Sequence, residues 1–593
     1  MTVVTVPGSG APGTQPPVTL GSSTSDSSSL AAQIGAQLAT QLTNVTTAPT
    51  TSGSVPSAPT VAGTTQILDI TTDTNTTVPS GSGYSVIYVT APTTGGGATV
   101  NASGTAQAGI TVLDGDGNNL LNVANATVAG LGGSDTVNAG GNSYVSLDSG
   151  DNSITATGNS TIVAAGGSNT ITAAGDAGST ASIQSSGTND VVSLGAGDAT
   201  VALGGSGATL YIGSGADSIA ALGTGSKIGI GSGDASISTS GSGNTTYAGT
   251  GSSTEDDSGT NNAIGGYTGS LAVTVSGTGS GIFADTGTVT ADITGGSDTL
   301  NGGLSTLINA TLSGSGDAVG AGTGITNLLF TSTATNGSVF GGLAGSTLNA
   351  DLEGANAVVG LAAGDAAITL GGGDASVWAN SGALNLLATG SGSDTINLYS
   401  GASTLTAGDS TSLLVNESTG SLVFVGGAGV STVVGSDGGT TLFGGADGVI
   451  NFTDPTGAAT FFAGAGNETL NAAGSTAPII ASASSLVGSS ASIVGGAGND
   501  TLIGGVGAAT FTGGAGANVY EFTSSISGGS ATIADFNTSS TLDLLGYGSA
   551  AAAAALASAT QNGTSVTLTL SDNTKITFLN QTAASLTGHI NSV

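Results

Sequence analysis

An interval of nine residues dominates the middle of this 593-residue chain. Aliphatic residues recur at that interval with Gly-rich turns between them, and the clearest run is Val192, Val201, Leu210, Ile219, Ile228 and Ile237. A nine-residue unit has room for a short strand and a tight turn, so two units make one coil of about 18 residues with a strand on each side. The interval therefore predicts an all-β chain folded as a parallel β-solenoid of the β-roll or β-helix kind.

The composition agrees with a narrow interior. The chain has 106 Gly, 4% aromatic residues, 38% hydrophobic residues and no Cys. Large side chains are too few to fill a conventional globular core, whereas a charged fraction of only 6% argues against disorder. We expect a thin core of Val, Ile, Leu and Ala, in which larger side chains would spread the sheets.

The charge balance excludes one class of partner. Lys and Arg together number 2 against 36 Asp and Glu, which gives a formal net charge of -34. Binding to nucleic acid needs a clustered basic surface that neutralises phosphates, so nucleic acid is not an expected partner. The sequence also has no apolar run of about 18 residues, so no membrane span is expected.

The chain divides into five predicted regions. Residues 1–60 are rich in Pro, Thr, Ser and Gly and predict an arm with one short amphipathic helix, in which Leu30, Ile34, Leu38 and Leu42 recur every four residues. Residues 61–110 alternate apolar and polar side chains and predict an amino-terminal β cap. The other regions are a degenerate nonapeptide solenoid at 111–494, sharper nonapeptides at 495–521 and a β-rich carboxyl-terminal segment at 522–593.

Three tandem nonapeptides at 495–521 follow the pattern G-G-x-G-x-D-x-U-x, beginning with Gly-Gly-Ala-Gly-Asn-Asp-Thr-Leu-Ile. They resemble the repeats of the RTX family of secreted bacterial proteins. The resemblance implies that backbone carbonyls and sixth-position Asp side chains bind calcium, with one ion shared by turns 18 residues apart. The sixth positions here are Asp500, Ala509 and Asn518, so Asp500 and Asn518 are the candidate ligands of one shared ion.

Weaker matches occur earlier in the chain. Asn119 holds the sixth position of one such unit, and Asp135, Asp217 and Asp394 precede strand residues in Gly-rich turns. Two explanations stay open for these residues: they are calcium ligands, or they serve turn geometry and solubility. Their counterparts 18 residues away are mostly Ala or Gly, so a full ladder of calcium ions is not expected.

The carboxyl-terminal segment adds to the resemblance. An Ala-rich helix is expected at 549–559 and a hairpin at 566–578. This order, directly after the nonapeptides, is similar to the uncleaved carboxyl-terminal signal of type I secretion substrates. The resemblance implies export by the type I secretion machinery to the medium or cell surface of a Gram-negative bacterium, a route that fits the lack of a signal-peptide pattern in residues 1–7.

Reactive side chains are scarce. His589 is the one His in the sequence. A Ser-His-Asp arrangement would have to use it, and a metal site built on several His side chains is excluded. Paired carboxylates are the remaining catalytic option, and the densest cluster, at residues 255–257, is interpreted as a solvated loop that interrupts the repeat. We therefore expect a protein without catalytic activity.

A repetitive, exported chain with few reactive groups favours a structural role. The prediction is an extracellular protein that self-assembles, with calcium, into a surface layer, filament or biofilm matrix, with contacts by strand addition at the coil ends. The alternative is a secreted adhesin that binds a host or surface glycan through residues 250–270 or the amino-terminal cap. A carboxylate-based glycosidase is a third class. Outward aromatics such as Tyr211 and Trp378 are candidate contacts.

Overall fold

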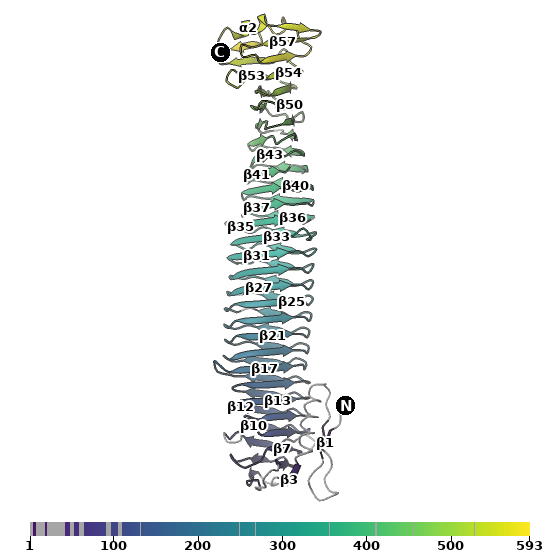
Figure 1. Ribbon diagram of the computed structural model, residues 1–593, viewed down its shortest axis with the longest axis vertical. Coiled ribbons are helices and arrows are strands. Elements are labelled where there is room, and N and C mark those ends of the chain that lie inside the picture. Colours follow the sequence, from purple (N-terminus) through teal and green to yellow (C-terminus); the bar gives the residue numbers. More distant parts are fainter. Residues whose placement is uncertain are drawn as a thin grey trace. The chain divides into compact units, whose positions relative to one another are not determined.

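The structure of the protein is a computed structural model, shown in Figure 1. It describes strands at 4–6, 18–20 and 42–47, and then residues 52–58, 65–90, 96–104, 109–130, 132–247, 249–266, 268–354, 356–408, 412–454, 456–526 and 528–593. The helix expected around Leu30, Ile34 and Leu38 lies outside the described residues. Two of the described strands, β1 (Val4–Val6) and β2 (Val18–Leu20), pair antiparallel.

The chain is a parallel β-solenoid of about 26 turns with about 18 residues per turn, which confirms the predicted fold class. The nine-residue interval has the predicted consequence. Val201 pairs with Ile219 in one sheet, whereas Leu210 pairs with Ile228 in the other. Alternate nonapeptides therefore build opposite sheets, and residues 18 apart stand side by side.

Two compact units make up the chain, Met1–Thr290 and Ala291–Val593, and the strand β29 (Thr288–Ile293) spans the division. In each unit we call the two faces of the solenoid the odd sheet and the even sheet, after the numbers of most of their strands (Figure 1). Within both units, neighbouring strands of a sheet run parallel, except in the carboxyl-terminal hairpins.

The odd sheet of the first unit contains β3 (Leu42–Thr47), β5 (Thr65–Ile70), β7 (Val86–Val89), β9 (Thr111–Asp114), β11 (Thr127–Gly130), β13 (Ser143–Leu147), β15 (Ser160–Ala164), β17 (Thr180–Ser185), β19 (Asp198–Leu203), β21 (Asp217–Ala221), β23 (Ala235–Thr239), β25 (Ser253–Asp257) and β27 (Ser270–Val275). Its even sheet contains β4 (Gly53–Ser54), β6 (Asn75–Thr77), β8 (Thr99–Ala102), β10 (Leu120–Ala124), β12 (Thr136–Gly140), β14 (Ser153–Ala156), β16 (Thr170–Ala173), β18 (Val191–Leu194), β20 (Thr209–Tyr211), β22 (Lys227–Gly229), β24 (Thr245–Tyr247), β26 (Ala263–Gly265) and β28 (Gly281–Phe283).

The odd sheet of the second unit contains β31 (Leu307–Leu312), β33 (Ile325–Phe330), β35 (Thr347–Leu352), β37 (Asp365–Leu370), β39 (Leu384–Ala388), β41 (Ala402–Ala407), β43 (Ser421–Val425), β45 (Thr440–Phe443), β47 (Ala459–Phe462), β49 (Ile479–Ser482), β51 (Thr501–Ile503), β53 (Val519–Thr523), β55 (Thr541–Leu545) and β59 (Ile590–Ser592). Its even sheet contains β30 (Thr299–Asn301), β32 (Ala318–Gly320), β34 (Ser338–Phe340), β36 (Ala357–Leu361), β38 (Ala375–Ala379), β40 (Ser393–Leu398), β42 (Ser412–Glu417), β44 (Val430–Val434), β46 (Val449–Thr453), β48 (Asn467–Asn471), β50 (Ser490–Val494), β52 (Ala508–Thr512), β54 (Ser530–Ile533), β56 (Thr560–Asn562), β57 (Ser565–Thr569) and β58 (Lys575–Phe578).

Alternation along most strands decides which side chains enter the core. In β27, Leu271, Val273 and Val275 are buried while the residues between them are exposed. Small and aliphatic residues fill most of the interior of the first unit, which also buries Tyr84 and Tyr88. The described residues of the second unit bury eight Phe side chains: Phe330, Phe424, Phe452, Phe461, Phe511, Phe522, Phe536 and Phe578. Glycine makes the room in at least one case, because a Cβ added at Gly504 would lie 2.3 Å from Cε1 of Phe522.

The segment 61–110, expected to form a cap, contains strands that continue the two sheets of the first unit. β5 pairs parallel with β3 and β7, and β6 pairs parallel with β8. Every residue of β7 is buried, so both faces of this strand are covered. The intervals are irregular, since Ile67 pairs with Val86 and Val86 with Thr111.

The carboxyl-terminal segment contains the expected helix and hairpin. The helix α2 spans Ala551–Ala557, and β57 pairs antiparallel with β58. β58 also pairs parallel with β54, and β59 pairs parallel with β55, so this segment extends both sheets of the second unit. Among the residues that the structure describes, no helix is long and apolar enough to cross a membrane.

Candidate functional site

Asp500 and Asn518 lie directly before β51 and β53, on adjacent strands of the odd sheet. Both side chains are buried, with exposed fractions of 0% and 1%. Asp500 Oδ1 accepts the backbone N–H of Ile479 at 2.9 Å, and Oδ2 accepts that of Gly496 at 2.9 Å. Asn518 Oδ1 accepts the N–H of Asp500 at 2.9 Å. The sixth-position side chains therefore bond backbone amides of the preceding coil and of their own turn.

The same contact repeats as a ladder in the even sheet of the first unit. Its members are the buried residues Asn119, Asp135, Asn152, Asn169 and Asp190, which precede successive strands from β10 to β18. Each backbone N–H donates to the Oδ1 of the next member along the chain, at 2.8, 2.8, 3.2 and 2.7 Å in order. These amides would otherwise be buried without an acceptor, and the ladder satisfies them.

Asp114 lies beside the first two members of this ladder. Its Oδ1 accepts a hydrogen bond from Asn119 Nδ2 at 2.8 Å, and its Oδ2 is buried without a hydrogen-bond partner. Burial, and then the charge of Asp135, raise the pKa of Asp114 well above its usual range. Burial raises the pKa of Asp135 to about 7. At neutral pH this buried pair therefore carries less than its full negative charge.

Asp217 and Asp394 are the two predicted ligands that belong neither to this ladder nor to the turns at 500 and 518. Asp217 Oδ1 accepts the N–H of Ala199 at 2.8 Å, and Asp394 Oδ1 accepts that of Ala375 at 2.8 Å. The Oδ2 atom of each is buried without a hydrogen-bond partner. Burial raises the pKa of Asp217 and raises that of Asp394 to about 6. Both residues thus bond the preceding coil in the manner of Asp500.

Calcium needs about six to eight oxygen ligands. All six predicted ligands instead accept hydrogen bonds from backbone amides, and in the described part of the chain no group of three or more His, Cys, Asp or Glu is placed to hold a metal ion. Calcium binding remains a prediction of the sequence.

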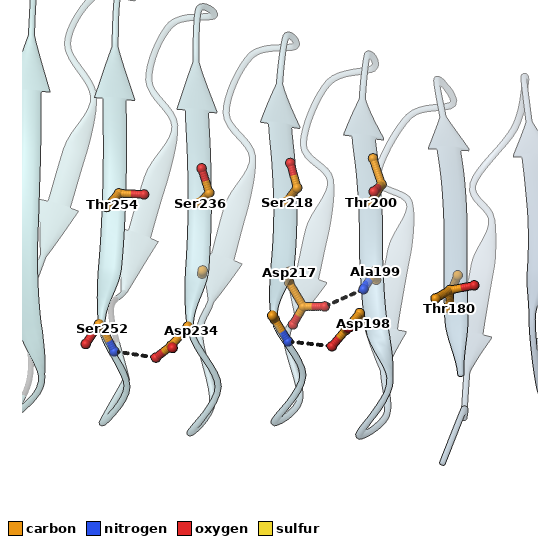
Figure 2. Close-up of a pocket in the computed structure, with 13 residues that line it drawn as sticks. Thr180, Asp198, Ala199, Thr200, Asp217, Ser218, Asp234, Ser236, Ser252 and Thr254 are labelled. Atoms are coloured by element: carbon orange, nitrogen blue, oxygen red, sulfur yellow. Dashed lines mark hydrogen bonds between the residues drawn. The ribbon is translucent and has the colours of Figure 1, made fainter. Parts of the chain in front are cut away.

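A second row of side chains was not predicted. It holds the fifth position of the nonapeptides, one residue before the sixth position, and we call it the fifth-position row. Asp198 Oδ1 accepts the N–H of Ala216 at 2.9 Å, and Asp234 Oδ1 accepts that of Ser252 at 2.9 Å (Figure 2). Asn499 does the same for the residue at 517. These side chains reach forward to the next coil, whereas sixth-position side chains reach back. The neighbouring pair of Asn and Asp at 499 and 500 is the sequence signal for both rows.

A shallow groove lies on the outer face of the odd sheet in the first unit, with a volume of about 490 Å³. A row of hydroxyls on adjacent strands lines it: Thr200, Ser218, Ser236 and Thr254 (Figure 2). A similar groove of about 520 Å³ lies on the outer face of β35 to β43 in the second unit. Hydroxyl and carboxyl groups line the first groove, and its lining residues include no Lys, Arg or His.

The acidic run at 255–257 is a strand of the core, which overturns its interpretation as a solvated loop. It belongs to β25, where Glu255 and Asp257 face inward with exposed fractions of 4% and 0%. Glu255 stands between Ile237 and Val273 in the same inward row. The register of the neighbouring coils fixes which side chains point inward, and here it overrides the preference of acids for water.

Polar neighbours compensate for these two acids. Thr246 Oγ1 donates to Glu255 Oε1 at 3.1 Å. Asp257 accepts hydrogen bonds from Asn262 Nδ2 and Ser280 Oγ, both at 2.7 Å. Burial raises the pKa of Glu255 to about 8, so this side chain is mostly a neutral acid at pH 7. The pair is enclosed in the core, where a substrate could not reach it.

His589 packs in the carboxyl-terminal segment. Its Nδ1 lies 3.1 Å from the backbone oxygen of Ser540, and its ring meets that of Phe536 edge-on, with centroids 6.2 Å apart. These contacts give the ring a packing role. Comparison of the chain with protein-family models, curated proteins and solved structures finds no significant match, so function is argued from the arrangements described above.

Proposed function

We propose that this protein is a non-catalytic extracellular structural protein that associates with copies of itself into a surface layer, filament or biofilm matrix. The observation that carries the proposal is the use made of its Asp and Asn side chains. The fifth-position and sixth-position rows bond successive coils to one another. Side chains committed in this way stabilise the stack of coils and are withdrawn from reaction with a substrate.

Contacts between chains are proposed to be lateral. The segment from β56 to β59, with α2, follows the last regular coil of the second unit, so open strand addition is disfavoured at that end. The net charge of -34 opposes close approach of two chains. We therefore expect assembly to need salt or a divalent cation such as calcium between the exposed carboxylates. Export by the type I route remains part of the proposal and rests on the sequence resemblance.

Sedimentation velocity of the full chain tests this proposal. Samples spanning a wide range of concentration are compared with and without millimolar-range calcium, the range of affinity of extracellular calcium modules. Growth of large species with concentration supports a structural polymer. A monomer at every concentration in both conditions contradicts it.

An adhesin that binds a glycan is the second candidate. The observation that favours it is the set of half-exposed aromatic rings on the even sheet of each unit, with Tyr211 in the first unit and Trp378 in the second. An adhesin binds its ligand as a single chain, whereas a layer protein associates with copies of itself and needs no ligand. The two roles are therefore separated by measuring ligand binding at concentrations where the chain does not associate.

A further inference from the structure

Aromatic residues alternate with glycine along one outward row of the even sheet in the first unit. The row is Tyr211, Gly229, Tyr247, Gly265 and Phe283, and each residue pairs in register with the next on adjacent strands from β20 to β28. The three aromatic side chains are 57%, 46% and 49% exposed. One ring therefore stands on every second coil.

The second unit repeats this alternation. Gly320, Phe340, Gly360 and Trp378 pair in register on β32 to β38. Phe340 and Trp378 are 55% and 48% exposed. We call the two rows the aromatic–glycine rows and treat each within its own unit.

Glycine in these rows makes space for the rings. The backbone conformation at these positions does not require glycine. None of Gly229, Gly265 and Gly360 has a positive φ. A Cβ added at Gly265 would lie 3.4 Å from Cδ1 of Tyr247, and one added at Gly360 would lie 3.5 Å from Cδ1 of Phe340. Tyr247 and Phe340 thus each lie against the glycine of the next coil, whereas Phe283 lies against Gly281 of its own strand.

A different aromatic pair shows what happens without the glycine spacing. Phe443 and Phe462 are partners on the adjacent strands β45 and β47. Their rings stack, with centroids 5.4 Å apart and planes 19° apart, so each ring covers a face of the other. Rings separated by a glycine coil are about 9.5 Å apart, from the spacing of strands, which is too far for them to stack on each other.

The rows carry no acidic side chain. The outward positions of the even-sheet strands from β20 to β28 and from β34 to β38 contain no Asp or Glu. Thr209, Lys227 and Thr245 flank the rings of the first unit in the neighbouring outward row. A single Lys is too little to hold a polyanion, whereas hydroxyl groups are suited to a neutral polar partner.

We propose that the aromatic–glycine rows bind a linear, neutral polysaccharide of β-1,4-linked pyranose units. The apolar C–H face of such a sugar ring stacks on an exposed aromatic face and hydroxyls at its edge bond flanking Thr side chains. In an extended β-1,4-linked chain the same face recurs at every disaccharide, a length similar to two coils of the solenoid. Successive rings therefore meet equivalent sugar units. This inference rests on the ligand-binding candidate function and does not depend on self-association.

Calorimetric titration of the full chain with cellohexaose, chitohexaose and a dextran oligosaccharide tests the proposal, at a concentration where sedimentation shows a single chain. We expect binding of one or both β-1,4-linked hexasaccharides and not of the α-linked dextran. Combining Tyr211→Ala with Tyr247→Ala removes two rings and is expected to weaken binding at least about tenfold, as for truncation of aromatic anchors at interfaces.

Two further variants separate ring geometry from ring presence. Gly265→Val keeps every ring but fills the space under Tyr247, so it is expected to tilt that ring and weaken binding. Phe443→Ala removes a ring that lies outside the rows and is expected to leave binding unchanged. Thermal unfolding of each variant checks that the fold is retained.

Two results would overturn the inference. One is the absence of binding to all three oligosaccharides by the wild-type chain. The other is unchanged affinity in the folded double variant of Tyr211 and Tyr247, accompanied by a lower melting temperature. That second result would mean that the rings only cover glycine and stabilise the sheet. Sedimentation velocity measures self-association independently of oligosaccharide binding. A failure of one proposal is therefore distinguished from a failure of the other.

Discussion

Asn169 shows how a single side chain connects coils. Its Oδ1 accepts the N–H of Asn152 at 3.2 Å, and its Nδ2 donates to the backbone oxygen of Gly166 at 2.9 Å. Its own N–H donates to Asp190 Oδ1 at 2.7 Å. An amide side chain suits this place because it supplies both an acceptor and a donor within a buried turn.

The variant Asn169→Ala is expected to leave the N–H of Asn152 buried without an acceptor, at a cost of about 1–3 kcal/mol. Amide hydrogen exchange at Asn152 measures the effect directly, because local opening of the coil becomes easier. The control is Thr170→Ala, which changes an exposed side chain on the next residue. Equal protection of Asn152 in both variants would show that the ladder contributes nothing to the coil.

Glu255 predicts a dependence of stability on pH. Burial raises its pKa from 4.5 to about 8, so the folded chain binds this proton more tightly than the unfolded chain does. The stabilising contribution of the protonated group is complete below pH 4.5 and is lost as pH rises toward 8. Glu255→Gln mimics the neutral acid and should make the melting temperature less sensitive to pH between 5 and 8. An unchanged pH dependence in that variant would contradict the assignment.

The nonapeptide turns before β51 and β53 also depend on side-chain acceptors of backbone N–H groups. Asp500 accepts two backbone amides, whereas Asn518 Oδ1 accepts one. Replacing Asp500 with Ala should therefore destabilise the second unit more than replacing Asn518 with Ala, with each unsatisfied amide costing about 1–3 kcal/mol. Denaturant unfolding of the two variants gives the comparison, and a larger loss for Asn518→Ala would contradict it.

Calcium titration of these turns follows from the same geometry. The predicted shared ion makes calcium binding depend on Asp500, whose oxygens here accept hydrogen bonds from backbone amides. Isothermal titration of the wild type and of Asp500→Asn provides the measurement. A calcium-binding event that is present in the wild type and lost in the variant would show that the turn rearranges around an ion.

Some elements were predictable and others were not, for physical reasons. The 18-residue register predicts that position 255 follows Val201, Ile219 and Ile237 in one inward row, and acidic charge alone led to the wrong interpretation of β25. In the segment 61–110 the intervals are irregular, so periodicity could not assign its strands to the sheets. The fifth-position row escaped notice because the calcium motif directs attention to the sixth position.

For the whole molecule, the repeat was sufficient to predict the solenoid. A regular interval of short strands and Gly-rich turns has few other solutions, because each coil can bury its apolar side chains only against its neighbours. Site chemistry was less predictable than fold. The sequence predicts that Asp500 and Asn518 precede adjacent strands, but it does not predict that their oxygens accept hydrogen bonds from backbone amides.

Several other buried acids extend the pH effect to the whole chain. Burial raises the pKa of Glu417 and of Glu468 to about 7, in the same direction as for Asp135 and Glu255. Acids whose pKa is raised on folding make the free energy of unfolding fall as pH rises through the range between unfolded and folded pKa. We expect a higher melting temperature at pH 5 than at pH 8 in scanning calorimetry. A higher melting temperature at pH 8 would contradict this prediction.

Negative-stain electron microscopy of the purified full chain shows whether the protein assembles. Grids are prepared at high protein concentration with calcium, and again after chelation in low salt. We expect filaments or sheets in the first condition, and their dispersal in the second as charge repulsion between chains is restored. Separate single chains in both conditions would contradict the structural role and leave glycan binding as the function to pursue.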